Sequence, residues 1–210
     1  MTALSLTQTI RRWQDQQGIA TVEFGILLVP LMFLLMGSMD LGHQFYLRSV
    51  AQGALDDASR RASVETPKFS SNGTTLEEKV ENMLKDQIRN VAPNAQYIIV
   101  QRNYYDFNGV GNPERLVTDN NGNGKFDADD DDCWEDSREN KSYDLDSGST
   151  GIGGANDVAF YSVRIIMPRL FPTASLLGFS KNIDLTVKTA VRNQPYDVQA
   201  SPAVLCGAGT

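Results

Sequence analysis

The stretch IATVEFGILLVPLMFLLMGSM, residues 19–39, decides the fold of the first part of the chain. It holds 21 residues, of which only Glu23 is ionisable. About 20 apolar residues in a helix are enough to span the hydrocarbon core of a bilayer, which is roughly 30 Å thick. Asp40 and His43 follow directly. The stretch therefore predicts one membrane-spanning helix.

A polar segment, residues 1–18, precedes this span and contains Arg11 and Arg12 near its end. Basic residues beside a span favour the cytoplasmic side of the membrane, so residues 1–18 are expected in the cytoplasm and the bulk of the chain outside it. An ordinary secretory signal has a shorter apolar region of about 7–15 residues. The length of the run therefore argues against an ordinary signal peptide.

Glu23 is an acid inside the apolar span, where an unpaired carboxylate costs several kcal/mol. Cleavage between Gly18 and Ile19 would create a free α-amino group at Ile19. This ammonium could pair with Glu23 of a neighbouring subunit, and a subunit in the wrong register would leave a charge unpaired in apolar surroundings. The alternative is a Glu23 side chain that reaches back to the membrane interface.

The order of polar leader, Gly18, Glu23, Phe24 and apolar helix resembles the class III prepilin cleavage motif. Residues 18–61 are similar to the TadE-like minor pseudopilins of the tight-adherence pilus (Tad/Flp, type IVb-like). GGANDVAFYSVRIIMPRLFP and VRNQPY resemble the family's closing segment, except that Gln194 stands where an acid is expected.

This resemblance implies a pilin-like subunit that a membrane prepilin peptidase cuts after Gly18. Its expected partners are the membrane and other pilin and pseudopilin subunits, with Glu23 and Phe24 at the assembly surface. The expected role is pilus assembly or initiation and surface adhesion, with the globular domain in the periplasm or on the extracellular filament.

The remaining pattern predicts an α+β fold, in which a long N-terminal helix precedes a small globular domain with an antiparallel sheet. The helix is expected over residues 19–63, the globular domain over residues 64–198, and a fraying tail over residues 199–210. Inside the domain, apolar periodicity predicts a further helix and three strands. Their ranges are residues 76–91 for the helix and 96–105, 157–167 and 183–191 for the strands.

The negative charge of the chain is concentrated in one segment. Between Asp119 and Asp136 there are eight carboxylates and one basic residue, Lys125, whereas the rest of the chain is electrically neutral. Polyanion binding needs a basic surface, so the composition argues against a nucleic-acid-binding protein.

Within this segment, residues 119–130 (DNNGNGKFDADD) follow the spacing of an EF-hand calcium loop. Calcium prefers six to eight hard oxygen ligands, and Gly124 permits the sharp turn that wraps the ion. No EF-hand helices flank the loop, so it is similar to isolated calcium loops of dockerin-like and other extracellular modules. The alternative is a solvated acidic loop. The predicted ligands are Asp119, Asn121, Asn123, the Lys125 carbonyl, Asp127 and Asp130.

The chain has two cysteines, Cys133 and Cys206. Outside the cytoplasm a disulfide between them is chemically permitted, and we expect this bridge over two separate thiols.

The sequence lacks the motifs of the common enzyme classes. His43, the single histidine, lies at the membrane boundary, and no P-loop, nucleophile elbow or dinucleotide fingerprint is present. We therefore expect neither an enzyme nor a small-molecule substrate. Two alternatives remain open: an uncleaved single-pass calcium-dependent adhesin or interaction protein, and a secreted hydrolase that uses the acidic loop.

Overall fold

A computed structural model describes residues 18–171, 173–176 and 178–207. Arg11, Arg12 and the rest of the predicted leader before Gly18 lie outside the described residues. The chain forms two compact units, which are described separately: Met1–Gln44 with Arg169–Lys181, and Phe45–Pro168 with Asn182–Thr210.

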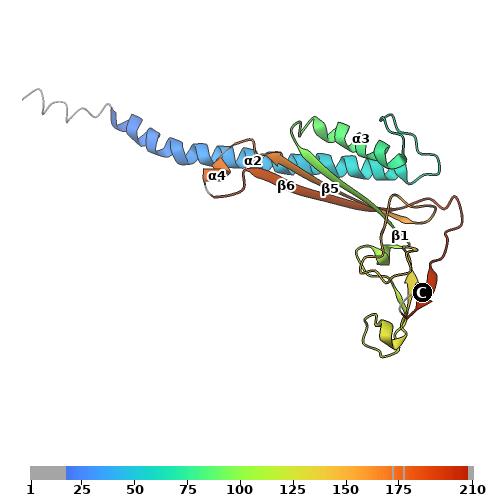
Figure 1. The fold of residues 1–210 in the computed structure, drawn as a ribbon. Helices are drawn as coiled ribbons and strands as arrows, with labels where there is room; N and C mark the ends of the chain where they lie inside the picture. Colours follow the sequence, from blue (N-terminus) through green and yellow to red (C-terminus); the bar gives the residue numbers. More distant parts are fainter. Residues whose placement is uncertain (1–17, 172, 177, 208–210) are drawn as a thin grey trace, which may run out of the picture. The chain divides into compact units, whose positions relative to one another are not determined.

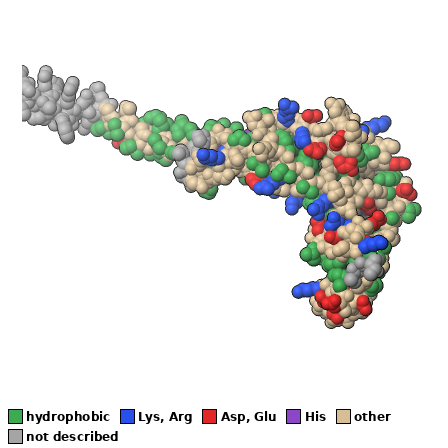
Figure 2. All heavy atoms as spheres, in the orientation of Figure 1, with side chains coloured by type: hydrophobic (Ala, Val, Ile, Leu, Met, Phe, Trp, Pro, Cys, Tyr) green, Lys and Arg blue, Asp and Glu red, His purple; other side chains and the backbone are tan. Residues whose placement is uncertain are grey.

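The long helix α2 runs from Ile19 to Ala62 and confirms the predicted N-terminal helix. Its first half belongs to the first unit and exposes most of its large apolar side chains, among them Val22, Phe24 and Ile26, each more than 60% exposed. Figure 2 shows this hydrophobic surface on the part of α2 next to the grey residues. The helix is long and apolar enough to cross a membrane and is compatible with a single-pass anchor.

An ion pair stabilises the first unit where the apolar span ends. Asp40 is 5% exposed, and its carboxylate accepts hydrogen bonds from the Arg169 guanidinium and from the Gln44 amide. Arg169 begins the segment Arg169–Lys181, which includes the short helix α4 (Thr173–Leu176). Since a buried carboxylate is costly without a partner, Arg169 accounts for the burial of Asp40.

The second unit contains an antiparallel four-stranded sheet in the order β4-β1-β5-β6. The strands are β1 (Gln96–Tyr104), β4 (Ser149–Thr150), β5 (Val158–Pro168) and β6 (Asn182–Arg192). Strands β5 and β6 pair without a register break from Val158↔Arg192 to Pro168↔Asn182. The predicted α+β class with an antiparallel sheet is confirmed.

Helix α3 (Leu76–Arg89) begins at a capping box formed around Thr75. The Thr75 hydroxyl accepts a hydrogen bond from the Glu78 backbone N–H, while the Glu78 carboxylate accepts from the N–H and hydroxyl of Thr74. These bonds lower the pKa of Glu78. The bond from the Glu78 N–H also satisfies a backbone donor that the first helical turn leaves free.

The hydrophobic core lies between the helices and one face of this sheet. In Figure 1, α3 and the C-terminal part of α2 lie side by side over β1, β5 and β6. Small residues on α2, such as Ala51 and Ala58, alternate with leucines and allow close packing. The buried members include Leu47, Leu55, Val80, Leu84, Ile88, Tyr161, Val163, Ile165, Ile183 and Val187.

A second, three-stranded sheet in the order β2-β3-β7 was missing from the sequence prediction. It consists of β2 (Leu116–Thr118), β3 (Cys133–Asp136) and β7 (Ala203–Cys206), and Trp134 is fully buried in it. The expectation of a fraying tail is therefore wrong for residues 203–206. Strand β7 is ordered by pairing with β3, from Cys133↔Cys206 to Asp136↔Ala203. The short 3-10 helices η2 (Phe107–Gly109) and η3 (Ala128–Asp130) complete this region.

Candidate functional site

The predicted calcium loop, residues 119–130, lies between strands β2 and β3 in the sequence. The Asp119 carboxylate accepts the backbone N–H groups of Gly122, Asn123 and Gly124 at 2.7, 3.2 and 2.7 Å. Gly122 and Gly124 have φ of 71° and 74°, a conformation that glycine adopts without steric cost. The sharp turn predicted at Gly124 is present, and Asp119 holds it closed.

Side-chain hydrogen bonds join four of the predicted ligands. The Asn121 and Asn123 amide nitrogens donate to Asp127 Oδ2 at 3.1 and 2.6 Å, and Asn121 also donates to Asp130. The hydrogen bond from Asn123, and then that from Asn121, lower the pKa of Asp127. The two amides thus place positive partial charge between the carboxylates.

The side-chain types fit a hard cation, because carboxylate and amide oxygens are the ligands that calcium prefers. The Lys125 N–H donates to the Asn123 side-chain oxygen at 2.7 Å, which fixes the loop at its seventh position. Among the described residues, however, no group of three or more His, Cys, Asp or Glu side chains is close enough to hold a metal ion. Calcium binding therefore remains a prediction.

A buried acid that follows the loop in sequence binds two of the loop's backbone N–H groups. Asp132 is fully buried, and its two oxygens accept the backbone N–H groups of Asn120 at 2.8 Å and Asp127 at 2.9 Å. Phe126 packs on Trp134, with ring centroids 4.8 Å apart. The loop is thus fixed to the three-stranded sheet by hydrogen bonds to Asp132 and by the packing of Phe126 on Trp134.

The predicted disulfide is present between Cys133 and Cys206. It joins β3, which follows the acidic loop, to β7. The Gly207 N–H also donates to the Asp132 carbonyl at 3.0 Å. The C-terminal strand therefore secures the end of the loop.

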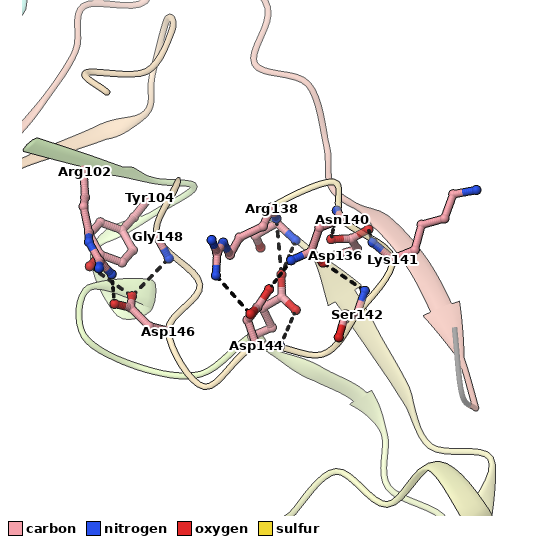
Figure 3. Close-up of polar contacts among 12 residues, drawn as sticks. Arg102, Tyr104, Asp136, Arg138, Asn140, Lys141, Ser142, Asp144, Asp146 and Gly148 are labelled. Carbon is pink, nitrogen blue, oxygen red and sulfur yellow. Dashed lines mark hydrogen bonds and ion pairs between the residues drawn. The ribbon is translucent and has the colours of Figure 1, made fainter. Parts of the chain in front are cut away.

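A second polar loop, residues 136–147, follows β3 (Figure 3). The Asp136 carboxylate accepts the N–H groups of Asn140 and Lys141, while Arg138 and Asn140 donate to the Asp144 carboxylate. Neither the loop nor its ion pair was predicted. A signal was available, because Asp136, Asn140 and Asp144 repeat the spacing of the first loop.

The predicted cleavage and assembly residues lie at the beginning of α2. Gly18 directly precedes the helix, Ile19 is its first residue, and Glu23 lies one turn further on. Gly18, Ile19, Glu23 and Phe24 are all exposed. Within the described part of the chain, the Glu23 carboxylate has no ion pair or hydrogen-bond partner.

Residues 18–60 match the model of the TadE family, described as TadE-like protein. The chain carries a TadE-like N-terminal region. The match confirms, over this N-terminal region, the resemblance seen in the sequence. No curated protein and no solved structure matches the chain.

The TadE-like match ends at residue 60, so the acidic loop and its supporting sheet lie outside it. Gln194, the residue that departs from the expected acid, has an exposed side chain and donates its backbone N–H to the Ser63 carbonyl at 2.8 Å. This backbone bond does not depend on the type of side chain at position 194.

Proposed function

We propose that this protein is a minor pilin-like subunit, a pseudopilin, of a tight-adherence pilus. It is inserted as a single-pass precursor with a cytoplasmic N-terminus, and a prepilin peptidase removes residues 1–18. The mature chain joins other pilin subunits through α2, and its globular domain is periplasmic or extracellular. We infer a structural role in assembly and adhesion rather than an enzymatic one.

The observation that carries this proposal is the Glu23 carboxylate on the exposed apolar surface of α2, which has no ion-pair or hydrogen-bond partner among residues 18–171, 173–176 and 178–207. In a lone membrane helix this charge costs several kcal/mol. Cleavage after Gly18 would provide the opposite charge at the Ile19 α-amino group of an adjacent subunit. The carboxylate then favours assembly in the one register that pairs the charges.

Pilus assembly in a strain carrying Glu23→Ala tests this proposal. We expect cleavage to proceed and incorporation of the subunit into pili to fall at least about tenfold, the effect of roughly 1.4 kcal/mol. Thr21→Ala, a change at a nearby exposed residue of the same helix, should assemble normally. Undiminished pili and attachment with Glu23→Ala would contradict the role of the ion pair.

The main alternative is an uncleaved, permanently anchored calcium-dependent adhesin. Such an adhesin would have the same membrane helix and acidic loop as the pseudopilin. The mature adhesin, however, would retain residues 1–18. A mature chain beginning at Ile19 therefore separates the two functions.

We also propose that residues 119–130 bind calcium, with Asp119, Asn121, Asn123, the Lys125 carbonyl, Asp127 and Asp130 as ligands. The convergence of Asn121, Asn123, Asp127 and Asp130 supports this second function. Isolated extracellular calcium modules bind at around 10⁻⁴–10⁻³ M, so the expected effect appears at millimolar calcium.

Thermal unfolding with and without millimolar calcium tests the metal site. We expect calcium to raise the melting temperature of the wild type and to have no effect on the double variant Asp119→Ala with Asp130→Ala. Asp86→Ala with Asp197→Ala removes two acids outside the loop and should keep the calcium effect. No rise for the wild type would refute the assignment.

A further inference from the structure

The two polar loops of the second unit share residue types, hydrogen bonds and backbone conformations at corresponding positions. Residues 119–130 and 136–147 can be superposed in sequence without a gap, and five of the twelve positions then carry the same type of side chain. An aspartate stands at positions 1, 9 and 11, an asparagine at position 5 and an aromatic residue at position 8. The pairs are Asp119 with Asp136, Asn123 with Asn140, Phe126 with Tyr143, Asp127 with Asp144 and Asp129 with Asp146.

The first aspartate closes the same turn in both loops. Asp119 accepts the N–H groups of positions 5 and 6, and so does Asp136, at 3.1 and 2.8 Å. The asparagine at position 5 then accepts the N–H of position 7, at 2.7 Å in the first loop and 2.9 Å in the second. These three hydrogen bonds are therefore common to both turns, and the first loop adds one from the Gly122 N–H at position 4 to Asp119.

The backbone conformations also correspond. Positions 4 and 6 have positive φ in both loops: 71° and 74° at Gly122 and Gly124, and 56° and 61° at Glu139 and Lys141. A non-glycine residue adopts this conformation at a cost of about 1–2 kcal/mol. Two such residues in one short loop indicate that its hydrogen bonds, rather than local preference, impose the turn.

A buried carboxylate supports each loop at the same two positions. Asp132 accepts the N–H groups of positions 2 and 9 of the first loop. Glu114, which is 2% exposed, accepts those of Ser137 at position 2 and Asp144 at position 9 of the second, at 2.8 and 3.0 Å. The two acids come from different places in the sequence, so the arrangement became visible only in the structure.

The two loops contact each other through the aromatic residues at position 8. Phe126 and Tyr143 stack with ring centroids 4.4 Å apart and an interplanar angle of 20°. Trp134 of β3 packs edge-on against both rings. The loops therefore form a pair around one small aromatic cluster.

The decisive difference lies at position 3. The first loop has Asn121, whose amide donates to the carboxylate at position 9. The second loop has Arg138, whose guanidinium donates to the position 9 carboxylate of Asp144 at 2.9 Å (Figure 3). A full positive charge thus lies in the second loop where the first has a neutral amide.

We propose that Arg138 determines which of the paired loops takes a metal ion. Its guanidinium supplies to the second loop the positive charge that calcium supplies to the first, so the second loop is complete without metal. The inference rests on the proposed calcium binding of residues 119–130. The end of the second loop agrees with a metal-free role, because Asp146 pairs with Arg102 and the Ser147 hydroxyl donates to the Gly109 carbonyl.

Replacing the guanidinium by a carboxylate should open the second loop to a metal ion. Arg138→Asp leaves carboxylates at positions 1, 3 and 9 around the vacated space. Terbium, a luminescent substitute for calcium, can be titrated into the full-length protein in detergent micelles, with Tyr143 and Trp134 as sensitisers. We expect one bound ion per wild-type chain and two per Arg138→Asp chain.

Two controls make this result specific. Arg115→Asp changes the charge by the same amount at an exposed residue outside both loops and should still bind one ion. Adding Asp144→Asn to Arg138→Asp should return the count to one. Arg138→Asn, which copies Asn121 of the first loop, repeats the test with a smaller change if the aspartate variant loses its near-ultraviolet circular dichroism.

The outcomes separate this inference from the proposed function. One ion in the wild type and two in the Arg138 variants support both. One ion in each overturns the role of Arg138 and leaves the first site standing. No ion in the wild type and one in the variants supports the role of Arg138 but refutes calcium binding at residues 119–130, and no ion in either refutes both.

Discussion

Glu114 shows how a single buried carboxylate can organise a loop that has little regular structure. Its oxygens accept three backbone N–H groups, from Ser137, Arg138 and Asp144. Burial raises the pKa of Glu114, while these hydrogen bonds act in the opposite direction. The balance leaves the pKa above its ordinary value, so ionisation of this residue opposes folding.

Substitution of this residue gives a prediction about stability and pH. In Glu114→Gln an amide N–H₂ faces a backbone N–H, and we expect the free energy of unfolding to fall by about 1–3 kcal/mol at pH 7. The pKa of Glu114 is higher in the folded than in the unfolded protein, so protonation of its carboxyl group stabilises the folded state. This contribution is fully present below the unfolded pKa and is lost as the pH rises through the folded pKa. The deficit of the variant should therefore widen as the pH is lowered from 7 toward the ordinary pKa of a glutamate.

Denaturant unfolding followed by Trp134 fluorescence at several pH values measures this deficit. Glu139→Gln changes an exposed acid of the same loop and should be nearly neutral. A deficit that shrinks on acidification would show that Glu114 is stabilised as the carboxylate instead.

The Asp40–Arg169 pair illustrates a residue-scale contact that sequence patterns do not predict. The sequence identifies Asp40 only as the residue at which the apolar run ends. In the structure its carboxylate is buried and forms an ion pair with Arg169, which lies 129 residues further along the chain. Local periodicity contains no information about such a partner. The same holds for Glu114 and Asp132, whose roles depend on backbone groups of neighbouring segments.

At the scale of elements, helix α2 has different surroundings along its length. From Phe45 onward, Leu47, Leu55 and the alanines between them are buried in the core of the second unit, whereas the large side chains of Ile19–Met39 are largely exposed. The same helix thus combines a segment suited to lipid or partner helices with one that belongs to a globular core.

Truncation of Leu55 tests the second of these segments. Leu55 is fully buried, so Leu55→Ala should lower the free energy of unfolding by about 2–5 kcal/mol through lost burial and a residual cavity. Leu145, which is 82% exposed, provides the matched control, and Leu145→Ala should change stability by less than about 0.5 kcal/mol. Equal effects of the two substitutions in denaturant unfolding would contradict the described core.

The larger elements were predictable because their signals are local. The capping box at Thr75, the apolar stripe of α3 and the alternation in β6 each occupy one continuous stretch of sequence. The three-stranded sheet lacks such a signal. Its strands have only three or four residues, and β7 becomes a strand by pairing with β3 about 70 residues earlier.

At the scale of the whole molecule, the Cys133–Cys206 disulfide closes a large part of the globular chain into a ring. The two residues are 73 positions apart. In the chain-entropy account, a ring of this size stabilises the folded state by about 4 kcal/mol, since it restricts the unfolded chain. The bridge was predictable from composition and compartment because only two cysteines are present.

Removal of the disulfide should weaken the three-stranded sheet in particular. For Cys133→Ser with Cys206→Ser we expect a loss of about 2–5 kcal/mol in the free energy of unfolding. Hydrogen exchange should accelerate most in β3 and β7 and least in β5 and β6. Uniform acceleration across both sheets would contradict the local role of the bridge.

The proposed function requires cleavage of the TadE-like N-terminal region after Gly18, before the mature chain assembles through the charge of Glu23. The mass of the mature protein, extracted from membranes of cells that contain the prepilin peptidase, measures this cleavage. We expect a chain that begins at Ile19, and the uncleaved precursor in cells that lack the peptidase. A mature chain that retains residues 1–18 in the presence of the peptidase would refute the proposed function.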